Sequence, residues 1–135
     1  MTSEHGKGRR ASAAVLLMAL VAACSNEASS NSEPEVRNEE GKASFYSSRL
    51  HGRQTASGQK YDQTALTAAH PDLPFGTLVC VTNMRNQRSV MVEINDRGPF
   101  TGGRIIDLSR RAAQEIGMIN SGSVRVRVRA CEEDS

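Results

Sequence analysis

The hexapeptide NDRGPF at residues 95–100 places an acid, a base and two turn residues directly after an alternating apolar stretch. Asp96 keeps the spacing of Val90, Val92 and Ile94, so we expect the strand to carry it toward the apolar side just where the strand ends. Burial would disfavour the ionised carboxylate, which suits a general acid near neutral pH. An aspartate in a turn also commonly accepts local hydrogen bonds, so the pattern alone leaves a structural role open.

Four further residues could take part in acid-base or carbohydrate chemistry. Arg97 could bind a substrate carboxylate or pair with a neighbouring acid. His70 could orient a substrate or hydrogen-bond to Asp96, although an isolated histidine is often a satisfied structural residue. Tyr61 is the best candidate for stacking on a sugar, and Asp62 is either a second acid of the site or a cap or turn residue.

The first 23 residues are typical of a secretory signal peptide rather than a membrane span. Residues 1–10 are polar and basic, and residues 11–23 are apolar but too short to cross a bilayer comfortably. The VAAC sequence at residues 21–24 resembles the lipobox of bacterial lipoproteins, in which the cysteine is acylated. We therefore expect a lipid anchor on Cys24 in the cell envelope, at the outer membrane facing the periplasm of a two-membrane bacterium, otherwise on the cell membrane exterior.

Composition divides the remaining chain into a linker, a domain and a tail. Residues 24–41 hold five Glu, one Arg and almost no apolar side chain, which predicts a disordered acidic linker after the lipidated cysteine. Residues 42–131 hold 13 Lys or Arg against 6 Asp or Glu, and residues 132–135 are an acidic tail. The basic domain favours anionic partners such as cell-wall polymers or lipid head groups, or it is simply a solvated face. We expect no nucleic-acid partner, because an exported protein would not meet one.

The domain is predicted to consist mostly of short strands separated by turn residues. Four segments have strand-like content: residues 42–48, 76–83, 88–95 and 124–131. Residues 107–118 form the one convincing helix, with Asp107 or Ser109 as its cap. Several strands and one short helix in about 90 residues indicate a small β-barrel that is closed or nearly closed.

Two cysteines, Cys80 and Cys131, lie on predicted strands of this domain. In an oxidising compartment they either pair, closing a loop of about 50 residues, or remain two separate buried thiols. Neither has a second Cys or His at ligand spacing, and His51 and His70 are isolated, so we expect no metal site. No motif implies a cofactor.

A series of motifs gives the domain a family resemblance. They are TASGQKYD at 55–62, LTAAH at 66–70, LPFGT at 73–77, NDRGPF at 95–100 and IIDLS at 105–109. In order and spacing they are similar to those of the rare lipoprotein A (RlpA) family, and the similarity covers nearly all of residues 42–131. The resemblance implies a mainly β fold, a six-stranded double-psi β-barrel with one short helix.

The resemblance also implies an endolytic lytic transglycosylase that acts on peptidoglycan glycan strands in cell-wall remodelling and daughter-cell separation. Such an enzyme cuts the β-1,4 bond between N-acetylmuramic acid and N-acetylglucosamine without water and leaves a 1,6-anhydro ring. Asp96 would protonate the leaving oxygen and then remove the proton from the C6 hydroxyl of the sugar, so one carboxylate serves as acid and base. Division-site proteins are a further class of partner.

One position departs from the family pattern. Where the family commonly has a glutamate that is proposed to work with the aspartate of NDRGP, this chain has Gln59. Glutamine cannot exchange a proton, so a mechanism with two carboxylates would be disabled, whereas a mechanism with one acid would survive. Gln59 therefore leaves a second function open, that of a non-catalytic peptidoglycan-binding lipoprotein of the same fold.

Overall fold

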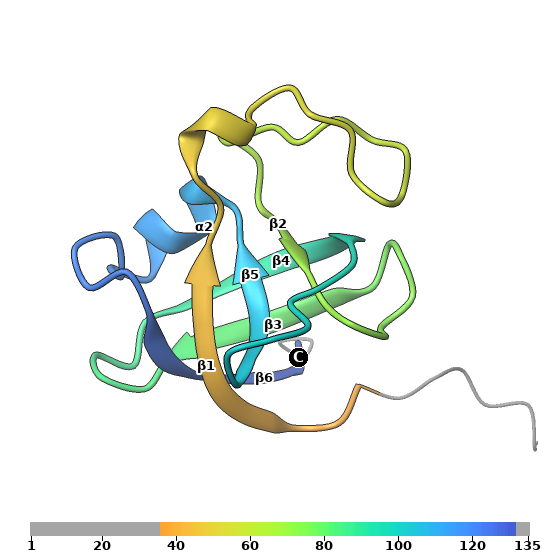
Figure 1. Cartoon of the computed structure of the whole chain (residues 1–135). Helices are drawn as coiled ribbons and strands as arrows, with labels where there is room; N and C mark the ends of the chain where they lie inside the picture. The colour runs from red at the N-terminus through yellow and green to blue at the C-terminus, as the bar shows by residue number, and fades with distance from the viewer. Residues whose placement is uncertain (1–35, 132–135) are drawn as a thin grey trace, which may run out of the picture. The chain divides into compact units, whose positions relative to one another are not determined.

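Strands form in the four segments that the sequence predicts and in two that it does not. The computed structural model describes residues 36–131 (Figure 1). Its elements are β1 (Glu39–Phe45), the 3-10 helix η3 (Ser48–Leu50), β2 (Thr67–Ala69), β3 (Leu78–Asn83), β4 (Ser89–Asp96), β5 (Arg104–Leu108), α2 (Arg110–Glu115) and β6 (Val124–Ala130). The predicted signal peptide, Cys24, most of the predicted linker and the tail at 132–135 lie outside the described residues.

The six strands close into one barrel in the order β1-β5-β2-β4-β3-β6, and β6 pairs with β1 to complete the circle. The pairs β1–β5 and β2–β4 are parallel, and the other four pairs are antiparallel. Closure removes the exposed sheet edges that an open sheet of this size would present. The prediction of a six-stranded barrel is therefore confirmed.

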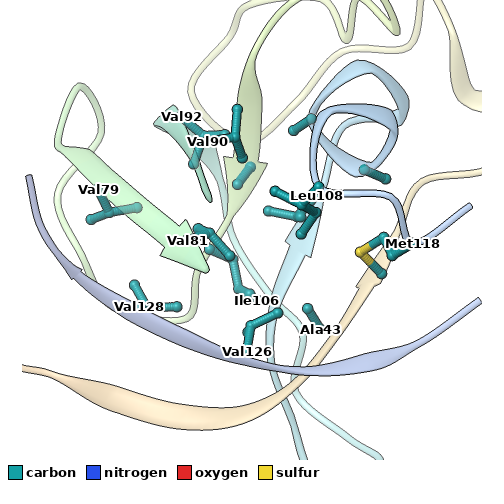
Figure 2. Close-up of a cluster of buried hydrophobic side chains, with 14 of the residues drawn as sticks. Ala43, Val79, Val81, Val90, Val92, Ile106, Leu108, Met118, Val126 and Val128 are labelled. Carbon is teal, nitrogen blue, oxygen red and sulfur yellow. The ribbon is translucent and has the colours of Figure 1, made fainter. Parts of the chain in front are cut away.

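The barrel interior is filled by inward-facing aliphatic side chains from the strands (Figure 2). The largest are Val79, Val81, Val92, Ile94, Ile106, Leu108, Val126 and Val128, each at most 1% exposed. Ile116 and Met118, from the end of α2 and the segment after it, add to the same cluster. Full burial of one such aliphatic side chain stabilises the fold by about 1.5 to 3 kcal/mol. This core therefore fixes the strands, whose ends form the rim of the barrel and carry polar residues.

The barrel begins earlier than the sequence analysis expects, because β1 starts at Glu39, inside the predicted linker 24–41. The backbone of β1 pairs with β6 from Glu39 onward. Glu40 also forms an ion pair with Arg127 of β6, with 3.1 Å between Oε2 and Nη2. Composition alone missed this part of the strand because backbone pairing and an ion pair hold it, rather than apolar side chains.

The other differences from the sequence prediction lie around β2, β5 and α2. β2 has three residues, too few to show a period. β5 covers residues 104–106, to which the sequence analysis gave no element, and residues 107–108, which it gave to the start of the helix. Ser109 caps α2, because its side chain accepts a hydrogen bond from the N–H of Ala112 at 3.2 Å. Asp107 is therefore not the cap; it lies in β5 and accepts hydrogen bonds from Ser44 and Arg104. Within residues 36–131, no helix combines the length and the apolar character needed to cross a membrane.

A disulfide joins Cys80 and Cys131, whose Cα atoms are 5.0 Å apart. Cys80 lies in β3 and Cys131 directly follows β6, the antiparallel neighbour of β3. The predicted pairing is thus confirmed, and the alternative of two separate thiols is wrong. On the chain-entropy model, a disulfide that closes a loop of this length stabilises the folded protein by about 4 kcal/mol.

Candidate active site

Asp96 is the last residue of β4 and lies at the rim of the barrel rather than in its core. The parallel pair β2–β4 shifts register here, because Ala68 pairs with Ile94 but Ala69 pairs with Asp96. Asn95 is therefore the extra residue of a β-bulge, and Ile94 and Asn95 are both buried. The bulge breaks the alternation from which the sequence predicts a buried Asp96. Its side chain is instead half-buried and lines a surface pocket.

Three hydrogen-bond donors hold the Asp96 carboxylate. Oδ1 accepts from the backbone N–H of Ala56 at 2.8 Å and from that of Arg97 at 2.9 Å. Oδ2 accepts a short hydrogen bond from the hydroxyl of Tyr46, the residue that directly follows β1. The carboxylate is therefore oriented by the end of β1, by the loop after η3 and by the loop after β4.

The Tyr46 side chain is itself fixed by its neighbours. Its ring packs against Tyr61 with 4.6 Å between centroids, and the Tyr61 hydroxyl accepts from the N–H of Arg110, the first residue of α2, at 3.0 Å. Burial and the hydrogen bond to Asp96 raise the pKa of Tyr46, so its phenol keeps its proton and donates. Tyr61 is 3% exposed, so its ring supports Tyr46 and is not the sugar-stacking platform that the sequence predicts.

Asp96 and Tyr46 line a pocket of about 170 Å³. Its other walls come from η3 and the loop that follows: Leu50, Arg53, Gln54, Thr55 and Tyr61. Arg53 and Gln54 are exposed and available to a ligand. A carboxylate, a phenol, a guanidinium and a carboxamide around one hollow can bind a polar ligand and exchange a proton with it. In the described part of the chain, no group of three or more His, Cys, Asp or Glu is placed to hold a metal ion.

A larger hollow of about 480 Å³ lies between the β3–β4 turn and the segment that follows α2. Two asparagines in its wall, Asn83 and Asn86, both donate from Nδ2 to the carbonyl of Ile116, at 2.8 and 3.0 Å. Its described lining residues include neither a carboxylate nor a histidine. Of these two hollows, only the one at Asp96 therefore has a carboxyl group in its wall.

Gln59 lies near the pocket without lining it. Its side-chain Oε1 accepts a hydrogen bond from Nδ2 of Asn95 at 3.1 Å. Its backbone carbonyl accepts from the N–H and the hydroxyl of Thr55, at 2.8 and 2.6 Å. The glutamine thus ties the loop after η3 to the bulge residue that precedes Asp96, and it supplies no proton.

The side chain of His70 makes no hydrogen bond to Asp96, so the predicted side-chain bond between them is wrong. The backbone N–H of His70 instead donates to the carbonyl of Asp96 at 3.2 Å. His70 is 3% exposed, and its Nδ1 accepts from the backbone N–H groups of Asp72 and Leu73, both at 3.2 Å. Its Nε2 therefore carries the proton and donates to Glu39 at 2.7 Å. His70 therefore links the loop after β2 to the start of β1. This is the structural role that the sequence analysis set against a role in orienting the substrate.

Arg97 and Asp62 also hold loops, and neither lines the pocket. The Arg97 guanidinium lies 4.1 Å from the centroid of the Phe75 ring and donates to the carbonyl of His70 at 3.2 Å. One oxygen of Asp62 accepts from the hydroxyl and the N–H of Thr64, at 2.7 and 2.9 Å. These hydrogen bonds lower the pKa of Asp62. Asp62 thus has the turn role that the sequence analysis left open.

Sequence reasoning missed Tyr46 and Arg53. Tyr46 is 50 positions from Asp96 in the chain, and only the closed barrel brings the two together. The available signal was an aromatic residue with a hydroxyl inside the predicted strand 42–48. Arg53 belongs to a polar loop without periodicity, where no pattern separates a ligand-binding cation from a solvated one.

The similarity to known proteins lies in the region of the chain that forms the barrel. Residues 38–128 match the family model described as "Lytic transglycolase". The endolytic peptidoglycan transglycosylase RlpA of Pasteurella multocida is 59% identical over 95 residues, which cover 70% of this chain and 32% of that protein. The protein of Synechocystis named "Probable endolytic peptidoglycan transglycosylase RlpA" is 63% identical over 82 residues, which cover 61% of this chain and 26% of that protein. The chain thus matches about a third or less of the length of these relatives.

Two solved structures share the fold at low sequence identity. The Streptomyces papain inhibitor superposes with a TM-score of 0.58 and 23% identity, covering 73% of this chain and 97% of the inhibitor. The expansin of Clavibacter michiganensis superposes with a TM-score of 0.57 and 18% identity, covering 73% of this chain and 52% of the expansin. At these identities the likeness shows the barrel fold alone.

Proposed function

The chain belongs to the RlpA family of double-psi β-barrel lytic transglycosylases, and from this membership we propose that it cleaves peptidoglycan glycan strands. The bond cut is the β-1,4 bond between N-acetylmuramic acid and N-acetylglucosamine, within the strand, with a 1,6-anhydro product. The observation that carries the proposal is the Asp96 carboxylate, oriented by three donors in a pocket that lies within the matched residues. Cell-wall remodelling and daughter-cell separation are the proposed context.

One carboxyl group can both donate and accept the proton that this reaction requires. Protonated Asp96 gives its proton to the glycosidic oxygen as the bond from that oxygen to C1 of the muramic acid breaks, so the leaving hydroxyl departs neutral. The C6 oxygen then bonds to C1, and its proton passes to the Asp96 carboxylate. Asp96 ends as it began, and no water enters. A mechanism of this kind does not require a second carboxylate, which the glutamine at position 59 could not provide.

Arg53 is the residue in the pocket wall that we assign to substrate binding. A muramic acid from which the peptide has been removed carries a lactyl carboxylate, and a guanidinium pairs well with a carboxylate. The sequence analysis gave this role to Arg97, whose guanidinium instead packs on Phe75 and bonds to a loop carbonyl. Gln54 lies next to Arg53 in the pocket wall and is suited to a sugar hydroxyl or acetamido group.

The location of the protein is proposed on the sequence alone. A lipid anchor on Cys24 would hold the barrel at a membrane of the cell envelope, and the acidic linker would let it reach the wall. Action on peptidoglycan, proposed from the family, agrees with that placement. Proteins of the division site remain proposed partners.

The test is mass spectrometry of denuded glycan strands after incubation with the purified full chain. We expect 1,6-anhydro products from the unmodified chain, and a loss of at least about 100-fold in rate for Asp96→Asn, because the amide cannot donate an acidic proton. Asp62→Asn makes the same chemical change at a carboxylate outside the pocket and should keep its rate within about twofold.

Two outcomes would contradict the proposal in different ways. A folded, unmodified chain that binds isolated cell walls but releases no anhydro products would instead support the non-catalytic peptidoglycan-binding function that Gln59 suggests. Equal rates for the unmodified chain and Asp96→Asn would show that another residue is the acid.

A further inference from the structure

The two oxygens of the Asp96 carboxylate have different surroundings. Oδ1 accepts from two backbone N–H groups, those of Ala56 at 2.8 Å and Arg97 at 2.9 Å. Oδ2 accepts from one hydroxyl, that of Tyr46. Each carboxylate oxygen offers about two lone-pair sites, so both sites of Oδ1 are occupied and one site of Oδ2 remains.

This asymmetry decides where a proton can be held. A backbone N–H only donates, so neither donor on Oδ1 can turn round to accept a proton placed on that oxygen. A hydroxyl both donates and accepts, so the partner of Oδ2 tolerates either state of the carboxyl group. We propose, on the basis of the function above, that Tyr46 is a positioning residue that presents Oδ2 of Asp96 as the single oxygen through which the glycosidic bond is protonated.

The surroundings of Tyr46 suit that role. Its ring packs on the buried Tyr61 at 4.6 Å, and the Tyr61 hydroxyl is bonded to the N–H of Arg110 at the start of α2. The Tyr46 hydroxyl is therefore held at a defined place by β1 on one side and by α2 on the other. Tyr46 also lines the pocket beside Asp96, so the carboxyl group that it orients belongs to the wall of that pocket.

The proposal assigns the proton a path that begins and ends on the same atom. The proton on Oδ2 passes to the glycosidic oxygen as the glycosidic bond breaks, and the proton of the C6 hydroxyl returns to Oδ2 as the anhydro ring closes. Tyr46 neither gains nor loses a proton over the cycle. Removal of the Tyr46 hydroxyl should therefore slow the chemical step without weakening the binding of the glycan.

The experiment compares kcat and KM of the full chain and of Tyr46→Phe on denuded glycan strands. The phenylalanine ring keeps the packing on Tyr61 and loses only the hydroxyl. We expect kcat to fall about 10- to 100-fold, because a carboxyl group free to rotate is misplaced for much of the time, and KM to stay within about threefold. Thr64→Val is the matched control: it removes a hydroxyl from a carboxylate outside the pocket, that of Asp62, and should leave both constants within about twofold.

Nuclear magnetic resonance gives a second readout that does not depend on activity or on the folding of the variant. A hydroxyl held by a carboxylate should give a downfield, slowly exchanging tyrosine proton signal in the unmodified chain, lost in Asp96→Asn. An unchanged kcat in a folded Tyr46→Phe, a rise in KM alone, or the absence of the signal would each overturn the positioning role. If the unmodified chain were active and Asp96→Asn inactive, such a failure would leave the proposed function standing. An inactive unmodified chain would remove both.

Discussion

Two of the polar pockets of this barrel, the one at Asn83 and the one at Asp96, differ in the hydrogen-bonding capacity that their side chains have left for a ligand. In the larger one, the amide nitrogens of Asn83 and Asn86 donate to the carbonyl of Ile116. Their amide oxygens accept from the backbone N–H groups of Arg85 and Arg88, respectively. In the smaller one, Asp96 keeps an unoccupied position on Oδ2. The two asparagines of the larger pocket therefore hold its loops together, whereas the smaller pocket keeps a carboxyl group with a free lone-pair site.

The difference teaches that a carboxyl group with a free lone-pair site, rather than pocket volume, distinguishes the candidate site. A side chain whose donors and acceptors are all satisfied within the protein has little to gain from a ligand. The larger hollow owes its polar wall to the need to satisfy the carbonyl of Ile116 at the end of α2. The pocket at Asp96 instead holds a carboxyl group that can change its protonation state beside an exposed guanidinium.

The largest effect on stability should come from removing the amide of Asn83 in the larger pocket. Asn83 is 1% exposed, and Asn83→Ala removes a donor to Ile116 and leaves the N–H of Arg85 without its partner. We expect the free energy of unfolding to fall by about 2 to 3 kcal/mol, measured by urea denaturation. The kcat/KM of the remaining folded protein should stay within about twofold of the original value.

Asn86→Ala serves as the control for this change. Asn86 is an exposed residue whose amide donates to the same carbonyl, so its loss should cost less, about 1 kcal/mol. If the folded fraction of Asn83→Ala showed a kcat/KM lowered tenfold or more, on the order of 1.4 kcal/mol in activation free energy, the larger hollow would be part of the site and the contrast would fail.

An intermediate effect should come from the cation of the smaller pocket. Arg53 is exposed and lines that pocket, so Arg53→Ala should leave stability within about 0.5 kcal/mol. We expect KM on denuded glycan to rise about tenfold with kcat nearly unchanged, because a hydrogen bond to a charged group contributes about 1.5 kcal/mol or more. Arg49→Ala is the matched control, since Arg49 is an exposed cation of the neighbouring η3 that does not line the pocket. Equal KM values for the two variants would remove Arg53 from the binding site.

The sequence predicted the fold best where the side-chain period is strict. β6 alternates valine and arginine without a slip, and its predicted and observed bounds differ by one residue at the end. Gly41 and the two glutamates before it were missed because pairing with β6, which lies more than 80 positions away, makes them a strand. β5 was missed for a related reason: its Asp107 looks like a helix cap locally but accepts from Ser44 across the β1–β5 pair.

The site divides in the same way. Asp96 was found because the acid, the glycine and the proline of NDRGPF are contiguous in the chain. Its half-buried position was not found, because the bulge at Asn95 depends on the register of β2 against β4. Tyr46 was missed because its contact with Asp96 exists only after the barrel closes. Residues that act through non-local pairing leave no mark in a local pattern.

The smallest effect should come from restoring the acid at position 59. In Gln59→Glu, a carboxylate oxygen can accept from Nδ2 of Asn95 as the amide oxygen does at 3.1 Å, so stability should change by less than about 0.5 kcal/mol. Because Gln59 bonds to Asn95 rather than lining the pocket, we expect kcat to change by less than about threefold, measured on the same glycan strands. Gln59→Ala separates the two properties of this side chain, because it removes the tie to Asn95 without adding an acid. A tenfold gain in kcat for Gln59→Glu alone would show that a second carboxylate can take part. The pocket at Asp96 would then be one half of a two-acid site, and its difference from the larger pocket would lie in a pair of carboxyl groups rather than in one free oxygen of a single carboxylate.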